Sequence, residues 1–337
     1  MVGLKRFLLL FFATVSIFFS GLALSDEQLT VYSGRSDKFV IPVVEAFTEK
    51  TGIKVRLHNA KSTALINKLT LEGKRTEADL FLSNDAGNLQ VGADKGLFLP
   101  LSDELSKDIP EQYRASDNSW IGLSSRMRVL VANTNSDHID SLNSVFDLAD
   151  PNLKDHLAIT HSANGSYIAG ATVYMLSAGD DKTKQWLEGM KANVDGKVFN
   201  KHSKVVKAVA DGKADVGLVN HYYIYRHLAK DPDAPIKIIL PDQGENGIGV
   251  AENIAGIAIS KYSKKTDAAK QFIAFLVSEE GQKIFAEVNR EYPVRPGVAA
   301  SPEVPAAGSF KVSNVAMNKL GAERNRTLDL IESVGMP

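Results

Sequence analysis

Ala78-Asp-Leu-Phe-Leu82 is a nearly continuous apolar stretch, which is typical of a parallel strand that is buried on both faces. Two earlier segments, Leu29-Thr-Val-Tyr32 and Ile53-Lys-Val-Arg-Leu57, are also predicted to be strands. Helices are predicted between the three strands, over residues 38–51 and 63–72, because apolar side chains recur there at helical spacing. Strands that alternate with helices predict an α/β fold with a parallel sheet.

The same alternation continues through the rest of the chain. Further strands are predicted over residues 126–133 and 255–260, and one long amphipathic helix over residues 268–285. A single sheet would be large for so many strands, so we expect two α/β lobes. The strands near Val129 and Ile257 are the candidates for crossing between the lobes.

The chain begins with the features of a secretory signal peptide. Lys5 and Arg6 precede an apolar segment at residues 7–19, and Ala23-Leu-Ser25 has the small residues of a cleavage site. We therefore predict that residues 1–25 are a signal peptide that is removed on export; the alternative is an uncleaved membrane anchor. No second apolar segment is long enough to span a membrane, so the mature protein is expected to be soluble.

Composition excludes several classes of chemistry. The 337 residues include no cysteine, which excludes disulfides, thiolate ligands, cysteine nucleophiles and a lipid-modified cysteine. The formal net charge is −1, and removal of Lys5 and Arg6 makes it −3. Because no long basic block remains, nucleic-acid binding is not expected. A secreted hydrolase is disfavoured, because neither a Gly-x-Ser-x-Gly nor a His-Glu-x-x-His motif is present.

An exported α/β protein with two lobes has the architecture of periplasmic solute-binding proteins. Such proteins bind a ligand in the cleft between hinge-linked lobes and close around it. We place lobe 1 at residues 26–130 and 251–300, and lobe 2 at residues 131–250 and 301–337. The architecture predicts a binding protein but does not specify its ligand.

Two adjacent tyrosines, Tyr222 and Tyr223, follow the short apolar strand Asp215-Val-Gly-Leu-Val-Asn220. A phenol has a pKa of about 10 and binds metals poorly while it is protonated. A hard trivalent cation can displace that proton, because the phenolate is a hard anionic oxygen donor. The pair therefore indicates an Fe(III) site; the alternative is that the two rings fill an interface between core and solvent.

Other polar groups at predicted strand ends suit an anion. Residues Ser162 to Ser166 follow the predicted strand Leu157-Ala-Ile-Thr160 and begin a predicted helix, whose backbone N–H groups can bind an anion. Arg126 lies at the start of a candidate crossing strand, and its guanidinium suits bidentate contact with carbonate or a carboxylate. A salt bridge between the lobes is the alternative for Arg126.

With these residues the chain resembles the periplasmic ferric-ion-binding proteins of bacterial iron ABC transporters. The binding proteins of that family have the type II periplasmic-binding fold. The resemblance covers essentially the whole mature chain, and the tyrosine pair after its strand is its most specific element. The segments that carry it are Leu29-Thr-Val-Tyr-Ser-Gly-Arg35, Ala78-Asp-Leu-Phe-Leu-Ser-Asn-Asp-Ala-Gly-Asn-Leu89, Trp120-Ile-Gly-Leu-Ser-Ser-Arg-Met-Arg-Val129, Asn220-His-Tyr-Tyr223 and Glu291-Tyr-Pro-Val294.

The resemblance implies roles for individual residues. Tyr222 and Tyr223 match the two phenolate ligands, and Tyr167 matches a third tyrosine used by one subgroup. Arg126 matches the arginine that holds a carbonate-type anion, and Asn220 is expected to support that anion. The implied site is three tyrosinates from the second lobe, with an anion or water completing an approximately octahedral shell.

Contact between the metal and the first lobe departs from the family pattern. Many relatives have a ligating His-Tyr pair, or a lone ligating His, where this chain has Ser36 and Asp37, so Asp37 is the remaining candidate ligand there. Arg226 is a candidate to support the site from outside the ligand shell, and His221 is expected to do the same or to lie at the surface.

The resulting hypothesis is a periplasmic, monomeric, non-enzymatic protein that captures Fe(III) and delivers it to the permease and ATPase subunits of an ABC importer. Carbonate or bicarbonate is the expected synergistic anion. The alternative is a binding protein for a small organic or anionic solute, such as a polyamine, sulfate or phosphonate, in the same fold.

Overall fold

The computed structural model describes residues 28–337, so the predicted signal peptide lies outside the described residues. Strands and helices alternate, as the sequence predicts. The strands are β1 (Gln28–Ser33), β2 (Lys54–Asn59), β3 (Leu80–Ser83), β4 (Phe98–Leu99), β5 (Ile121–Asn133), β6 (Leu157–Thr160), β7 (Val198–Phe199), β8 (Val216–Asn220), β9 (Ile236–Ile239), β10 (Ala251–Ser260) and β11 (Tyr292–Pro293).

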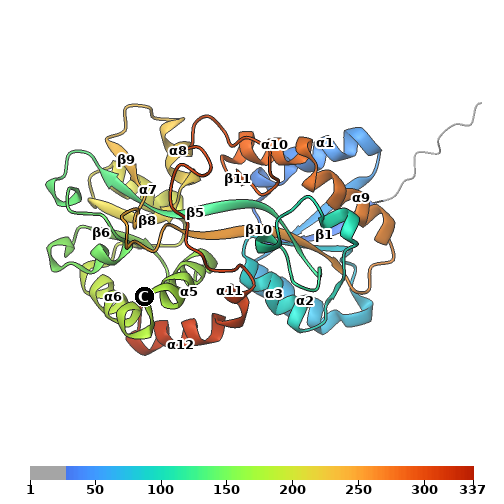
Figure 1. Ribbon diagram of the computed structural model, residues 1–337, viewed down its shortest axis with the longest axis horizontal. Helices are drawn as coiled ribbons and strands as arrows, with labels where there is room; N and C mark the ends of the chain where they lie inside the picture. Colours follow the sequence, from blue (N-terminus) through green and yellow to red (C-terminus); the bar gives the residue numbers. More distant parts are fainter. Residues whose placement is uncertain (1–27) are drawn as a thin grey trace, which may run out of the picture.

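The helices cover both faces of the strands (Figure 1). They are α1 (Ile41–Thr51), α2 (Ser62–Glu72), α3 (Ala86–Asp94), α4 (Asp103–Ser106), α5 (Gly165–Ala178), α6 (Asp180–Asn193), α7 (His202–Ala210), α8 (Tyr222–Leu228), α9 (Thr266–Val277), α10 (Glu279–Asn289), α11 (Lys319–Ala322) and α12 (Arg324–Val334). Short 3-10 helices include η1 (Asp37–Phe39) and η4 (Asp137–Ile139).

Strand pairing is parallel at the two ends of the sheet and antiparallel in the middle. β1 is parallel to β2 and β3, and β6 is parallel to β7 and β8. β10 is antiparallel to β3 and β5, and β5 is antiparallel to β8. The resulting order is β2-β1-β3-β10-β5-β8-β6-β7, with β4, β9 and β11 pairing alongside. This mixed, curled sheet confirms the predicted α/β class.

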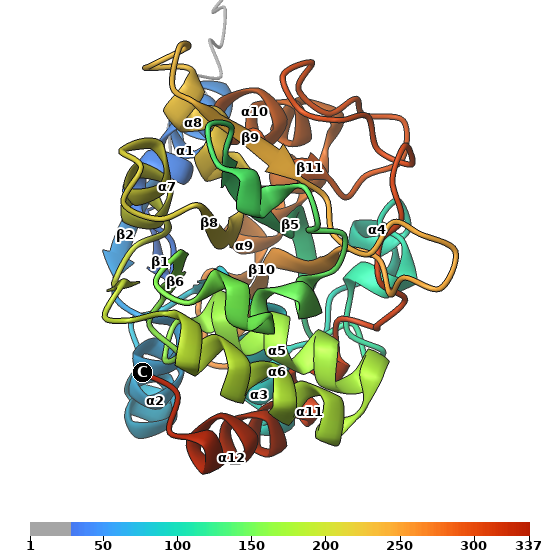
Figure 2. The same cartoon turned by 90° about the vertical axis from the view of Figure 1, so that its left-hand side faces the viewer.

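β5 and β10 run through both halves of the molecule, as expected for the crossing strands (Figure 1). One half, here the β1 half, contains β1–β3, α1–α3, α9 and α10; the other, the β6 half, contains β6–β8 and α5–α8 (Figures 1 and 2). A single sheet is large for so many strands, but the hydrogen-bonded ladder is continuous between the two halves. The reason is that β5 and β10 are long enough, at 13 and 10 residues, to serve both halves.

Each half has its own apolar interior. In the β1 half, the rings of Phe47 and Phe272 lie 4.8 Å apart, and both side chains are fully buried. In the β6 half, Tyr174 packs edge-on against Trp186 with 5.0 Å between ring centroids. A pocket lies between these two apolar interiors, and residues from both halves line it.

The C-terminal segment contacts both halves. α11 packs against α3, whereas α12 packs against α5 and α6 (Figure 2). The lobe boundaries proposed from the sequence, including the one at residue 301, therefore stay a prediction. Among the helices of residues 28–337, none is both long and apolar enough to cross a membrane.

The single helix predicted over residues 268–285 is wrong, because the chain forms two helices that meet at Ser278. Ser278 has extended backbone angles (φ −68°, ψ 163°), and its hydroxyl accepts a hydrogen bond from the Gly281 amide as an N-cap. The apolar spacing continues across the break, which is why the pattern did not reveal it. A Cβ atom at Gly281 would lie 2.2 Å from the carbonyl oxygen of Phe275.

Gly281→Ala tests this junction. The added methyl group forces the two helices apart, so we expect the free energy of unfolding to fall by about 1–3 kcal/mol. Urea denaturation followed by circular dichroism gives the value. Glu287→Ala, at an exposed position of the same helix, is the matched control and should stay within about 0.5 kcal/mol of the parent. Equal stability of the two variants would contradict the described junction.

Candidate metal centre

Tyr222 and Tyr223 form the first turn of α8, directly after β8 ends. The β8 ladder with β5 reaches Asn220, which pairs with Arg128, so the tyrosines emerge where the sheet stops. Their ring centroids lie 4.5 Å apart with an interplanar angle of 34°. Tyr222 is buried and Tyr223 is half-buried. Burial and the neighbouring Tyr222 raise the pKa of the Tyr223 phenol.

The two tyrosines line a pocket of ≈ 100 Å³, here called the tyrosine pocket. A cavity needs about 10–15 Å³ to hold one water, so this pocket has room for one ion with a small companion ligand. Side chains from the β1 half and the β6 half both contribute. The lining residues are Gly34, Arg35, Ser36, Phe39, Asn84, Arg126, Asn164, Ser166, His202, Tyr222, Tyr223 and Glu291.

Arg126 brings a buried donor without a partner to this pocket. Its side chain is 3% exposed, and its Nη2 atom has no hydrogen-bond partner among the described residues. Burial lowers the pKa of Arg126, with Tyr222 and Glu291 acting in the opposite direction. A guanidinium nevertheless remains charged in proteins. A buried, charged donor without an acceptor is costly, so the pocket is suited to an anionic oxygen beside Arg126.

Arg35 and Glu291 form a buried ion pair at the pocket wall. Two contacts of 2.8 and 2.9 Å join Arg35 Nη2 to the carboxylate, and Ser124 donates a third hydrogen bond at 2.7 Å. Burial alone would raise the pKa of Glu291, but the charges of Arg35 and Arg126 outweigh it and hold that pKa below its usual range. Glu291 is thus an anion that is already neutralised, which leaves Arg126 as the uncompensated charge.

His202 also lines the pocket, but no sequence pattern predicts this role, because it is an isolated histidine at a helix start. It is buried, its ring lies 5.1 Å from that of Tyr223, and its Nε2 atom has no partner among the described residues. Nδ1 lies 3.5 Å from Arg128 Nη1, which can only donate. Burial, with Arg128 and Arg126, lowers the pKa of His202 well below its usual value. The ring is therefore neutral and carries its proton on Nε2. After Arg126 Nη2, this N–H group is a second buried donor without an acceptor among the described residues.

The N-terminus of α5 forms another wall. Asn164 caps the helix by accepting a hydrogen bond from the Ser166 amide at 2.9 Å, and both residues line the pocket. Because a helix turns by about 100° per residue, the next side chain, Tyr167, points away from the pocket. Tyr167 is buried with its ring stacked on Trp186, and its hydroxyl has no partner among the described residues. The structure does not bring Tyr167 together with the tyrosine pair.

Two other expected site residues are also used elsewhere. Ser162 contacts the C-terminus: its amide and hydroxyl donate to the carbonyl oxygens of Pro337 and Met336 at 2.7 and 3.1 Å. Asp37 is exposed, is hydrogen-bonded to Asn59 and does not line the pocket. Neither position was predictable, because the partners lie 22 or more residues away in sequence.

Asn220 and Arg226 lie behind the pocket. Asn220 is buried, accepts from Arg128 Nη1 at 3.3 Å and donates to Ser166 Oγ at 3.3 Å, so it supports two groups near the site. Arg226 lies 5.1 Å over the Phe39 ring, and that ring in turn contacts Tyr222 with 5.6 Å between centroids. Both residues act on the pocket through their neighbours.

His221 is excluded as a ligand by its own hydrogen bonds. Its Nδ1 accepts from the Met127 amide at 3.1 Å, and its Nε2 donates to the Arg290 carbonyl at 2.7 Å. Burial lowers the pKa of His221 to about 4, so the ring is neutral with both nitrogens occupied. This agrees with the expectation that His221 supports the site from behind.

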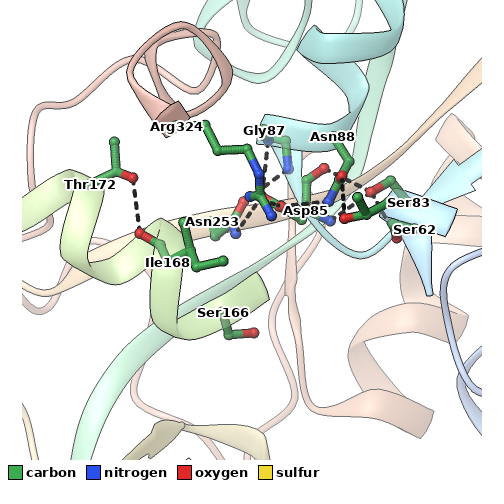
Figure 3. Close-up of polar contacts among 12 residues, drawn as sticks. Ser62, Ser83, Asp85, Gly87, Asn88, Ser166, Ile168, Thr172, Asn253 and Arg324 are labelled. Atoms are coloured by element: carbon green, nitrogen blue, oxygen red, sulfur yellow. Dashed lines mark hydrogen bonds and ion pairs between the residues drawn. The ribbon is translucent and has the colours of Figure 1, made fainter. Parts of the chain in front are cut away.

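A second polar cluster connects the two halves beside the tyrosine pocket (Figure 3). Arg324, at the start of α12, contacts Asp85 at 3.2 Å. Asp85 also accepts from Gly87, Asn88 and Asn253, at 2.9, 2.8 and 3.2 Å. The Asp85 carboxylate is therefore fully used and is not free to bind a metal. A cavity of ≈ 650 Å³ lies beside this cluster and shares Arg35, Ser36, Asn84 and Asn164 with the tyrosine pocket.

The chain is similar to known proteins along nearly its whole length. The profile of the family described as bacterial extracellular solute-binding protein matches residues 43–312. Iron uptake protein A1 of Synechocystis sp. is 30% identical over 88% of this chain and 84% of that protein. The major ferric iron-binding protein of Neisseria meningitidis serogroup B is 30% identical over 93% of this chain and 94% of that protein. The solved ferric binding protein from Campylobacter jejuni superposes with a TM-score of 0.86 at 30% identity, covering 92% of this chain and 100% of that chain.

Removal of the Glu291 carboxylate tests the charge arrangement. Glu291→Ala leaves Arg35 buried without its partner and removes a negative charge that also acts on Arg126, so we expect the free energy of unfolding at pH 7 to fall by about 3–5 kcal/mol. Because the pKa of Glu291 is depressed, its contribution is present above the unfolded-state pKa and is lost as the pH falls through the folded-state value.

Denaturant titrations between pH 7 and pH 3 measure both effects. Glu303→Ala is the control, because Glu303 pairs with Arg290 at the surface with 45% of its side chain exposed. That variant should lose less than about 1 kcal/mol. A Glu291→Ala protein as stable as the control variant would show that the buried pair is not as described.

Proposed function

The chain belongs to the bacterial extracellular solute-binding protein family. Members of this family are the binding components of ABC transporters and are not enzymes. We propose that this protein captures Fe(III) in the tyrosine pocket. The names of its relatives support iron as the cargo, because these relatives are similar to this chain over about nine-tenths of its length. The observation that carries the proposal is the contact of two phenols, Tyr222 and Tyr223, in the same pocket as Arg126, whose Nη2 atom has no partner within residues 28–337.

The proposed ligands are the phenolate oxygens of Tyr222 and Tyr223. Tyr167 is left out, because its helix directs it into the core. The β1 half contributes Ser36 and Asn84 to the pocket but no free carboxylate, since Glu291 is paired with Arg35. Two protein ligands leave the remaining coordination positions to exogenous groups.

Charge balance identifies the class of exogenous ligand. Fe(III) with two phenolates carries one positive charge, and Arg126 adds another. A carbonate dianion brings the sum to zero, whereas water leaves two positive charges in a buried pocket, which is unfavourable. Within the pocket lining, Arg126 Nη2 and His202 Nε2 are buried donors for which residues 28–337 supply no acceptor, and the α5 N-terminus adds its partial positive charge.

Delivery and release follow from the same geometry. We propose that the closed form docks on the permease and ATPase subunits of an importer as a monomer. Separation of the halves breaks the contact of Phe39 with the tyrosines and exposes the iron, which weakens binding. Return of protons to the two phenols acts in the same direction, because bound metal holds them deprotonated.

Tyr222→Phe and Tyr223→Phe are expected to lower Fe(III) affinity by at least about 100-fold each, because each removes an anionic ligand. Both should also weaken or shift the visible charge-transfer band of ferric tyrosinate. Competition with a chelator and absorbance spectroscopy give the two readouts. Tyr225→Phe, on the same helix but outside the pocket, is the matched control and should behave as the parent.

Unchanged colour and affinity in both pair variants would refute the ligand assignment. Saturable binding of an organic solute, with no visible band in the parent protein, would favour the small-solute alternative.

Arg126→Gln tests the anion. Loss of charge-assisted hydrogen bonds of about 1.5–3 kcal/mol lowers iron affinity roughly 10- to 100-fold in bicarbonate buffer. In bicarbonate-free buffer the parent should fall to the level of the variant, so the two proteins converge. Arg126→Lys keeps the charge and should retain part of the bicarbonate effect. An Arg126→Gln protein with the full bicarbonate response would contradict this role.

A further inference from the structure

A second group of metal-ligating side chains lies away from the tyrosine pocket. His138 is in η4, His156 comes directly before β6, and Asp215 comes directly before β8. Since β6 and β8 are parallel, the residues that precede them lie at the same edge of the sheet. Tyr222 and Tyr223 follow the other end of β8, so the two sites are separated by the length of that strand.

The three side chains converge on one point. His138 Nδ1 and His156 Nδ1 lie 2.7 and 2.8 Å from the same oxygen, Oδ2 of Asp215. Their imidazole centroids are 4.2 Å apart, and the ligand atoms of all three residues lie within 4.8 Å of one another. A carboxylate oxygen can accept two hydrogen bonds, so both imidazoles can donate to Oδ2. The same two nitrogens and this oxygen form a converging set of three donor atoms for a cation.

The backbone around these residues is tightly held. The Asp215 amide donates to the His156 carbonyl at 2.8 Å, and the Asn133 amide donates to the Asp215 carbonyl at 2.8 Å. Ser136 accepts from the His138 amide at 3.1 Å, and its hydroxyl also hydrogen-bonds the Asp215 side chain. Such an outer contact orients a ligating carboxylate. The ligands are thus positioned before any ion binds.

We propose that His138, His156 and Asp215 form a second metal site, which takes a divalent transition ion such as Zn²⁺ from solution. Two imidazoles and one carboxylate are a donor set that suits Zn²⁺, whose bonds to them are about 2.0–2.2 Å. An ion between the nitrogens and Oδ2 replaces the shared proton contacts. The imidazoles are 42% and 39% exposed, so the ion can enter and water can complete the shell.

The donor chemistry separates this site from the tyrosine pocket. Fe(III) is a hard cation that prefers phenolate and carbonate oxygens, whereas neutral imidazole nitrogen favours the borderline divalent ions. No residue is shared between the two groups. The second site therefore stands whether or not the tyrosine pocket binds iron.

Calorimetric titration of the mature protein with Zn²⁺ at about pH 7.5 tests the proposal, because imidazole must be neutral to bind. The protein is titrated both iron-free and after Fe(III) loading, so that occupancy of the tyrosine pocket is controlled. We expect one equivalent of Zn²⁺ at micromolar concentrations in both forms. His156→Ala and His138→Ala should each weaken binding by at least about 10-fold.

His58→Ala, at an exposed histidine of β2, is the matched control and should bind Zn²⁺ as the parent does. X-ray absorption of the Zn²⁺-loaded protein should show two imidazole nitrogens. Circular dichroism and iron colour unchanged in the variants would show that they are folded. Zn²⁺ binding that is absent, or equal in the parent and both histidine variants, would overturn the second site.

Discussion

The antiparallel pairing of β5 with β10 is the constraint on which the rest of the molecule depends. These strands join the two halves, and Arg126 pairs with Asn253 within this ladder. On its other side β5 pairs with β8, which places Asn220 beside Arg128 and starts α8 at the pocket. The anion donor and the tyrosine pair are therefore held near each other by the backbone hydrogen bonds of one strand, β5.

Buried charge then determines what the pocket can hold. Glu291 is neutralised by Arg35, but Arg126 has no counter-ion among the described residues, and the neutral ring of His202 adds a donor. This surplus of positive charge and hydrogen-bond donors makes binding of a bare cation in the pocket unfavourable. Two phenols that give up protons, together with a dianion, convert the same pocket into a neutral ferric complex. The anion and the metal therefore bind as one ligand set.

Sequence reasoning predicted the α/β class, the crossing strands and the place of Tyr222, because each depends on local periodicity or on strand ends. Tyr167 was expected to be a ligand but does not line the pocket here, since one residue of helix changes the direction of a side chain by about 100°. Sequence reasoning missed His202, which has no local pattern and reaches the pocket only through tertiary packing. Ser162 differs from its expected role because the C-terminus, 174 residues away, accepts its hydrogen bond.

The central claim is that the pair at the start of α8 binds the iron directly. An anomalous difference map at the iron absorption edge, from crystals of the Fe(III)-loaded protein, tests this claim most directly. The account predicts one peak within bonding distance of the Tyr222 and Tyr223 phenol oxygens, with an anion contacting Arg126 and no bond from Tyr167. A peak ligated by Asp37 or Tyr167, or one outside the tyrosine pocket, would contradict it.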